Sequence, residues 1–256
     1  EIALAHELAR ADKQSDPATL LLLRFSDASG DAAQSSPKLG GKLEPAEVKY
    51  LERKLQVLEG ICEGRLAGST DDAIGRMLAG RVVKSKELKI LEIGVLFGVG
   101  AAYLHHTLSP RFERVRLVLL DPFEGYYGKD HLDPLTGLPV TRAAVERNLA
   151  RCGIAAEDAE ILEGFSTDDD IRSAAEAAGP YNVIVIDGDH SAQGIRADFE
   201  GYADMLKTGG TLVIDDYGSE DWPDVTSFVV AWCPCLNTGV AKLTVTALRS
   251  FLGFLH

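Results

Sequence analysis

LEIGVLFGVG, residues 91–100, places three glycines close behind the apolar run KILEIGV at 89–95. The apolar run is typical of a buried strand, and the pattern at 99–108 is typical of a helix. A glycine-rich turn between a strand and a helix often binds a small anionic or polar ligand. The stretch therefore predicts a ligand-binding turn, and the residues around it decide which ligand it takes.

From residue 88 onward, apolar runs alternate with helical patterns. The apolar runs lie at 89–95, 115–121, 159–164, 181–187 and 211–215, and the helical patterns at 99–108, 142–152, 168–178 and 192–206. This alternation is typical of a parallel sheet with helices on both faces. Near the end of the sequence, KLTVTAL and SFLGFL predict an antiparallel pair at one edge. We therefore predict an α/β fold with a doubly wound, Rossmann-like, mostly parallel sheet of seven strands.

The first third of the sequence has helical patterns. Residues 1–24 predict one or two helices, and the stretch at 26–45, rich in Ser, Asp, Gly and Pro, predicts a mobile linker or lid. Pro45 and the apolar spacing after it predict a further helix, as does TDDAIGRMLAGRVV at 70–83. We therefore divide the chain into a helical N-terminal extension, residues 1–80, and an α/β domain, residues 81–256.

The 256 residues carry a formal net charge of -13, and the sequence pI is near 4.9. Such an acidic chain lacks the positive field that attracts phosphate backbones, so we expect no nucleic-acid partner. No apolar stretch approaches the roughly 20 residues of a membrane span, so we expect no membrane association. The four cysteines, Cys233 and Cys235 among them, offer no disulfide or metal framework, which favours a reduced, cytoplasmic protein. The helical first third is the expected interface of a homo-oligomer.

The glycine turn differs from the two common phosphate-binding motifs. The dinucleotide motif G-x-G-x-x-G needs a glycine where this chain has Leu96, whose side chain would obstruct the approach of a diphosphate. No Gly-Lys-Ser/Thr follows, which excludes a P-loop. The turn therefore favours a nucleoside without a diphosphate.

Two acidic residues accompany this turn. Asp121 ends the second predicted strand, where a carboxylate can accept two hydrogen bonds from a ribose diol; the alternative is that it caps the loop before Pro122. Glu92 lies inside the first strand and is costly to bury unless it is paired. It is therefore expected to brace the turn or to face a cationic part of the ligand.

A second acidic group lies at strand ends further along the chain. Asp187 ends the fourth predicted strand, and Asp215 and Asp216 end the fifth. Adjacent parallel strands bring their carboxyl ends together, and converging carboxylates repel one another unless a cation lies between them. Oxygen ligands favour Mg²⁺, with Ca²⁺ or Mn²⁺ as alternatives, so these three residues are candidate metal ligands. In the other interpretation they are loop or capping residues and no metal binds.

His190 follows Asp187 by three residues and precedes the helical pattern at 192–206. Its usual pKa lies near neutral pH, so beside a metal it is a candidate general base, with Asp187 as its catalytic partner. The loop at 122–141 is long enough to cover a substrate. Tyr126 and Tyr127 in this loop are candidate substrate contacts, unless they pack on the body of the protein.

With these residues in place, the sequence from 88 to 255 resembles class I S-adenosylmethionine-dependent methyltransferases. The resemblance implies a first cofactor motif made of Glu92, Gly94, Gly98 and Gly100, with Asp121 as the ribose acid. It also implies further cofactor contacts by Phe123, stacked on the adenine, by Ser166, near the adenine, and by Asp187.

DGDH (187–190) and DDY (215–217) resemble the macrocin O-methyltransferase family, which methylates sugar hydroxyls of antibiotic natural products. The resemblance implies Mg²⁺ ligands at Asp187, Asp215 and Asp216 and a base at His190. Ala192 and Gln193 depart from the aromatic and acidic pair that this family places after the His-Ser. The predicted function is Mg-dependent transfer of a methyl group to a hydroxyl of a small, sugar-bearing molecule.

Three other functions stay open on the sequence. One is a metal-independent N- or O-methyltransferase, in which the Asp pair holds a substrate amine. Another is a nicotinamide-dependent oxidoreductase, against which Leu96 argues. The last is a non-catalytic nucleoside-binding protein of the same fold.

Overall fold

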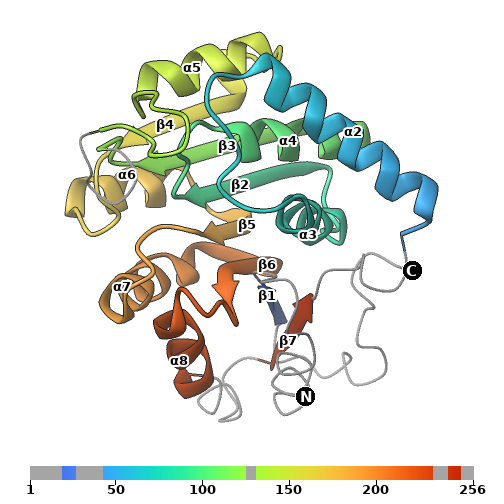
Figure 1. The fold of residues 1–256 in the computed structure, drawn as a ribbon. Helices are drawn as coiled ribbons and strands as arrows, with labels where there is room; N and C mark the ends of the chain where they lie inside the picture. Colours follow the sequence, from blue (N-terminus) through green and yellow to red (C-terminus); the bar gives the residue numbers. More distant parts are fainter. Residues whose placement is uncertain (1–18, 27–42, 125–130, 233–241, 249–256) are drawn as a thin grey trace.

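The computed structural model describes residues 19–26, 43–124, 131–232 and 242–248, and Figure 1 shows how their elements are arranged. One sheet runs through the described part of the chain with the strand order β4-β3-β2-β5-β6-β1-β7. The strands are β1 (Thr19–Ser26), β2 (Glu87–Ile93), β3 (Arg114–Asp121), β4 (Ala159–Glu163), β5 (Tyr181–Ile186), β6 (Leu206–Tyr217) and β7 (Lys242–Leu248).

Five neighbouring strands, from β4 to β6 in the sheet order, run parallel. β1 pairs antiparallel with β6, and β7 pairs antiparallel with β1. The α/β class and the parallel sheet are therefore confirmed. The parallel part has five strands, and among the described residues the antiparallel edge consists of β1 and β7, of which β1 was not predicted as a strand.

The prediction of helix up to residue 24 is wrong, because Thr19–Ser26 is a strand. This segment contains four consecutive leucines, a run without the 3.6-residue period of an amphipathic helix. The open side of β6 offers the segment a row of hydrogen-bonding partners. Local propensity cannot reveal such pairing, since β structure depends strongly on its tertiary surroundings.

Helices cover both faces of the parallel strands (Figure 1). They are α2 (Pro45–Ile61), α3 (Thr70–Arg81), α4 (Val99–Leu108), α5 (Arg142–Arg151), α6 (Asp169–Ala178), α7 (Ala192–Tyr202) and α8 (Pro223–Trp232). α2 to α5 contribute to one hydrophobic cluster, and α6 to α8 contribute to the other. The sequence-based helices after residue 88 correspond to α4 to α7, the last of which ends earlier than expected.

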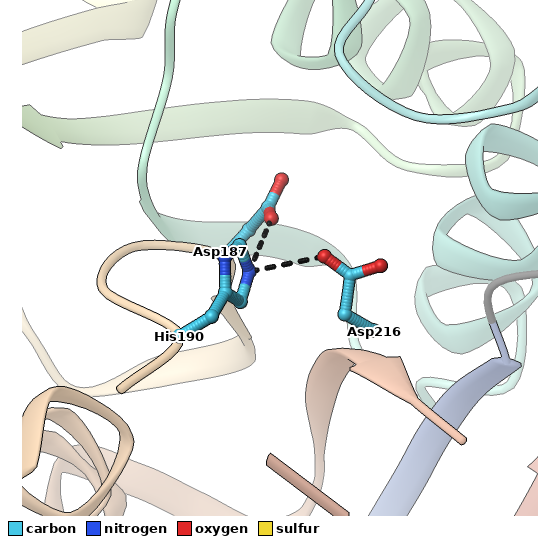
Figure 2. Close-up of side chains that lie close together, drawn as sticks. All are labelled: Asp187, His190 and Asp216. Atoms are coloured by element: carbon cyan, nitrogen blue, oxygen red, sulfur yellow. Dashed lines mark ion pairs between the residues drawn. The ribbon is translucent and has the colours of Figure 1, made fainter. Parts of the chain in front are cut away.

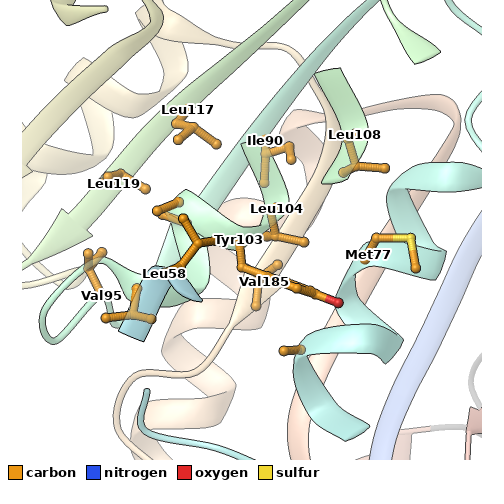
Figure 3. Packing of buried hydrophobic residues seen from close by; sticks show 14 of the residues in the cluster. Leu58, Met77, Ile90, Val95, Tyr103, Leu104, Leu108, Leu117, Leu119 and Val185 are labelled. Carbon is orange, nitrogen blue, oxygen red and sulfur yellow. The ribbon is translucent and has the colours of Figure 1, made fainter. Parts of the chain in front are cut away.

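The two clusters draw on alternate residues of the same strands. On β2, Leu88 and Ile90 belong to the cluster under α2 to α5, whereas Leu91 and Ile93 belong to the cluster under α6 to α8. Figure 3 shows the first cluster, with Ile90 close to side chains of the surrounding helices. Successive residues of a strand face opposite sides, so a strand that is apolar throughout needs cover on both faces.

α2 and α3 precede the first parallel strand and pack into its core. Pro45 begins α2, where its missing N–H costs nothing. Ser69 caps α3 in a capping box, since its hydroxyl accepts the Asp72 N–H while the Asp72 carboxylate accepts the Ser69 N–H. Leu55 of α2 and Met77 of α3 are buried in the same cluster as β2. The division of the chain at residue 80 stays a prediction.

Some sequence-based predictions fall outside the described residues. They concern most of the linker or lid at 26–45, the second C-terminal strand, Tyr126, Tyr127, Cys233 and Cys235. Within the described ranges, no helix has the length and apolar character needed to cross a membrane. The cytoplasmic location and the homo-oligomer stay predictions.

Asp198 is a charged residue inside the core on the α7 side. It lies on α7, is 1% exposed, and forms a side-chain hydrogen bond with Ser166. Its Oδ2 has no hydrogen-bond partner among the described residues. Burial raises the pKa of Asp198 from 3.8 to about 6, against the hydrogen bond from Ser166. The ionised carboxylate therefore destabilises the folded protein near neutral pH.

Asp198→Asn is expected to raise the free energy of unfolding at about pH 8 by about 1–3 kcal/mol relative to the native protein. Because the folded protein holds the Asp198 proton more tightly than the unfolded chain, this carboxyl favours folding most at low pH. That contribution is lost as the pH rises through about 6. Asparagine keeps an acceptor for Ser166 and cannot ionise.

Urea unfolding at about pH 4 and about pH 8 measures the difference. The matched control is Glu200→Gln, which lies on the exposed side of the same helix beside Arg196. The control is expected to change stability by less than about 0.5 kcal/mol at either pH. A loss of stability in Asp198→Asn at the higher pH would contradict the expectation.

Candidate active site

The glycine turn lies directly against the loop that follows β5. A Cβ added at Gly94 would lie 1.9 Å from the carbonyl oxygen of Asp187, so only glycine fits there. Gly94 also has a φ of 86°, in the left-handed region that favours glycine. The Asp187 N–H donates to the carbonyl of Ile93 at 2.9 Å, which ties the two strand ends together. The turn and the Asp187 loop therefore form one continuous surface.

The rest of the predicted cofactor motif continues around this turn. Gly98 precedes α4 with a φ of 72°, and Gly100 lies in the first turn of that helix beside the Glu92 side chain. Leu96, where the dinucleotide motif needs glycine, adopts a φ of 52°. This left-handed backbone is costly for leucine, so the turn holds a conformation that its sequence does not favour locally.

Asp121 braces the turn from the neighbouring strand. Its Oδ2 accepts the backbone N–H groups of Val95 and Leu96 at 2.7 and 3.0 Å. Its Oδ1 accepts the N–H of Phe123 at 2.7 Å. The capping role considered for Asp121 is therefore present in the structure. Binding of a ribose by the lone pairs that remain stays a prediction.

The adenine contacts predicted for Phe123 and Ser166 also stay predictions. Phe123 is buried at 6% exposure, which leaves little of its ring for stacking. Ser166 follows β4, and its carbonyl accepts the hydroxyl of Tyr202 at 2.8 Å. The neighbouring Phe165 is 48% exposed at the same strand end. Phe165 thus offers a more accessible ring than Phe123.

Asp187, His190 and Asp216 come together at the carboxyl edge of the sheet (Figure 2). The Nε2 atom of His190 lies 3.3 Å from Oδ1 of Asp187 and 3.2 Å from Oδ2 of Asp216. Asp216 has a φ of 57°, an unusual conformation that turns it away from the regular strand. The ring of Trp222 lies over the imidazole with a centroid distance of 4.9 Å.

Asp215 faces a different partner from Asp216. It is 4% exposed, and its Oδ2 accepts a hydrogen bond from Nη2 of Arg76 on α3. The same nitrogen donates to Oδ2 of Asp187 at 2.6 Å, and Nη1 donates to Oε1 of Glu92 at 3.1 Å. Glu92 was expected to need a charged partner, and Arg76 of the same protein is that partner. A cation does lie between the carboxylates of Asp187 and Asp215, and in the structure it is a guanidinium.

The pKa values of this cluster reflect one positive charge shared by three carboxylates. Burial raises the pKa of Asp215 to about 8 and that of Glu92 to about 7, and in both cases Arg76 opposes the rise. Burial also opposes the charge on Asp187, but Arg76 and His190 together lower its pKa. Burial disfavours the imidazolium of His190, yet its pKa is raised because the hydrogen bond and charge of Asp187 outweigh burial. One arginine therefore does not compensate the ionised forms of all three carboxylates.

Sequence reasoning missed two residues of this site, Arg76 and Trp222. Arg76 lies on the face of α3 that packs inward, between the buried Ile74 and Met77. An arginine in an otherwise apolar stripe rarely stays unpaired, and this signal was present in the sequence. Trp222 lies in an irregular segment before α8, and no periodicity indicates its contact with His190.

Comparison with known proteins identifies the domain that carries this site. Residues 91–217 match a family model described as a methyltransferase domain. The domain runs from β2 to the end of β6 and includes all the predicted catalytic and metal residues.

One curated relative is similar over 165 residues at 28% identity. It is an L-olivosyl-oleandolide 3-O-methyltransferase from Streptomyces antibioticus. The similar region covers 62% of this chain but 36% of the relative, so the chain spans about a third of the length of that protein.

Two solved structures share the fold of the methyltransferase domain and its surroundings. One is CalS11, a calicheamicin methyltransferase, with a TM-score of 0.51 at 17% identity, covering 86% of this chain and 99% of the other. The second is the apo form of CalS11, described as a TDP-rhamnose 3'-O-methyltransferase, with a TM-score of 0.50 at 17% identity, covering 84% and 99%. These structures confirm the fold, and the domain match confirms the resemblance to methyltransferases.

Gly94→Ala is expected to disrupt the site, because its Cβ would overlap the Asp187 carbonyl and its backbone would be strained. We expect a loss of about 3 kcal/mol or more in the free energy of unfolding, measured by urea denaturation. Gly60→Ala is the control, since Gly60 lies in α2 and a Cβ added there would meet no atom within 4 Å. The control is expected to gain up to about 1 kcal/mol. Equal stability of both variants would contradict the close approach at Gly94.

Proposed function

We propose that this protein is an S-adenosylmethionine-dependent O-methyltransferase that acts on a hydroxyl of a small molecule, a sugar unit of a natural product. The observation that carries the proposal is the position of His190, held between Asp187 and Asp216 beside the glycine turn. A proton acceptor and a cofactor turn at the same sheet edge are what this reaction needs. The curated relative, named as a sugar-directed 3-O-methyltransferase, supports the choice of acceptor.

The charge of the site suits a cationic cofactor. S-adenosylmethionine carries a sulfonium and an ammonium group, and its nucleoside has no phosphates. Glu92 has an Oε2 atom with no hydrogen-bond partner among the described residues, close to the first turn of α4. Asp121 stands at the neighbouring strand end. We assign the ribose to Asp121, the adenine to the region of Ser166, and the positive groups of the cofactor to the Glu92 side of the turn.

In the proposed reaction the acceptor oxygen attacks the methyl carbon in line with the sulfonium. The C–O bond forms as the C–S bond breaks, and S-adenosylhomocysteine leaves as a neutral thioether. The acceptor hydroxyl gives its proton to the imidazole of His190. Asp187 and Asp216 stabilise the resulting imidazolium, and Trp222 holds the ring in place. The site would hold the two reactants in line.

Mg²⁺ is part of this proposal, and the donor set decides which residues would hold it. Ligand atoms of Asp187, His190 and Asp216 lie within 4.8 Å of one another, close enough to share an ion. The two carboxylates offer the hard oxygen donors that Mg²⁺ prefers, whereas imidazole suits other divalent metals better. Asp187 and Asp216 would therefore hold the ion, and His190 would remain the base. A bound Mg²⁺ would lower the pKa of the acceptor hydroxyl.

His190→Gln is expected to reduce the rate of methyl transfer by about 10²–10⁴-fold while leaving the affinity for S-adenosylmethionine within about threefold. The loss follows because glutamine cannot accept the proton. The measurements are release of S-adenosylhomocysteine, with L-olivosyl-oleandolide and TDP-rhamnose as acceptors, and calorimetry with the cofactor. His105→Gln, a histidine on α4 that pairs with Ser109, is the control and is expected to keep full activity.

Cofactor binding without transfer to either acceptor would contradict the sugar assignment but not the cofactor. Tight binding of NADH without binding of S-adenosylmethionine would contradict the function as a whole. Full activity of His190→Gln would remove the proposed base.

Treatment with EDTA is expected to lower the transfer rate at least about tenfold, and added Mg²⁺ is expected to restore it. The affinity for S-adenosylmethionine, measured by calorimetry in the same samples, is the internal control and is expected to change little. Full activity after EDTA, with no metal found by elemental analysis, would favour the metal-independent alternative.

A further inference from the structure

Arg76 enters the active site from outside the methyltransferase domain. It lies on α3, before the matched residues 91–217, and is 5% exposed. Its guanidinium contacts carboxylates at the ends of three strands: Glu92 of β2, Asp187 after β5 and Asp215 of β6. The Arg76 side chain therefore links three neighbouring strands, β2, β5 and β6, at the carboxyl edge of the sheet.

This contact divides the acidic cluster into two sides. Asp187 belongs to both, because its Oδ2 faces Arg76 and its Oδ1 faces His190. Asp215 and Asp216 are neighbours in sequence but point to different sides, Asp215 to Arg76 and Asp216 to His190. The arginine side carries three carboxylates, and the histidine side carries Asp216 and the second oxygen of Asp187.

An ion coordinated by Oδ2 of Asp187 and Oδ2 of Asp215 would have to take the place of Nη2 of Arg76, which donates to both atoms. Arginine cannot give up its charge, and its planar fork matches two carboxylates at once. Moving this buried guanidinium away from its carboxylate partners is strongly unfavourable. We therefore expect Asp215 to stay paired with Arg76 when a metal ion binds.

We propose that Arg76 is the resident cation of the active site and restricts divalent metal binding to a single ion held by Asp187 and Asp216. Asp215 is then a positioning residue that anchors Arg76 and does not coordinate the ion. This inference rests on the metal site of the proposed function, and it departs from the sequence resemblance, which implied Asp215 as a third ligand.

The test is a Mn²⁺ titration of the full chain followed by electron paramagnetic resonance of the free ion. The native protein is expected to bind one Mn²⁺. Asp216→Asn is expected to weaken this binding by more than about tenfold, and Asp215→Asn by less than about threefold. These two substitutions are matched, because they are the same change at adjacent positions.

Arg76 itself is tested by two variants. Arg76→Lys keeps the charge and is expected to bind one Mn²⁺. Arg76→Gln removes the charge, frees Asp215, and is expected to bind about two Mn²⁺ or to bind the first at least about fivefold more tightly. Circular dichroism melts report folding, and if Arg76→Gln does not fold, the Asp215 and Asp216 pair decides the matter alone.

Equal loss of Mn²⁺ affinity in Asp215→Asn and Asp216→Asn would overturn the inference, as would the absence of any Mn²⁺ binding by the native protein. Binding of S-adenosylmethionine and methyl transfer are measured separately in the same preparations. Failure of those two measurements would overturn the proposed function, whereas failure of the Mn²⁺ pattern alone would overturn only the role of Arg76.

Discussion

The close approach of Gly94 to the carbonyl of Asp187 is the constraint on which the site depends. It brings the turn after β2 and the loop after β5 into direct backbone contact, since no side chain can stand between them. The glycine turn and the loop that carries His190 are thereby parts of one edge of the sheet. Parallel strands supply the direction of both segments, and hydrophobic cores on both faces hold those strands in register.

On this edge the protein gathers more negative charge than it neutralises. Arg76 is shared by three buried carboxylates, and His190 is shared by two residues, one of which is the same Asp187. A folded protein tolerates such an imbalance only where a bound cation or protons compensate for it. The cationic cofactor and the divalent ion of the proposed function would relieve this imbalance, so that their binding would also stabilise the folded protein.

The sequence predicted the parallel strands, the helices between them and the convergence of Asp187, Asp215 and Asp216 with His190 beside them, because apolar periodicity and strand-end position are local signals. It failed at β1, whose pairing with β6 depends on a distant edge. It also missed Arg76, since the fold, and not the spacing, decides which carboxylates an inward-facing arginine reaches. The split between Asp215 and Asp216 follows from that contact and from the backbone of Asp216, neither of which is visible in DDY.

The position of Arg76 on α3, outside residues 91–217, affects how these residues can be exchanged between related proteins. A chimera that exchanged residues 91–217 with those of a relative would keep this arginine but receive a foreign set of carboxylates. A fragment that began at residue 91 would lose the countercharge and also the apolar cover that α2 and α3 give to β2. The segment needed to build this site therefore extends beyond the matched residues 91–217 and includes α3. Substitutions in α3 and at the strand ends are expected to covary.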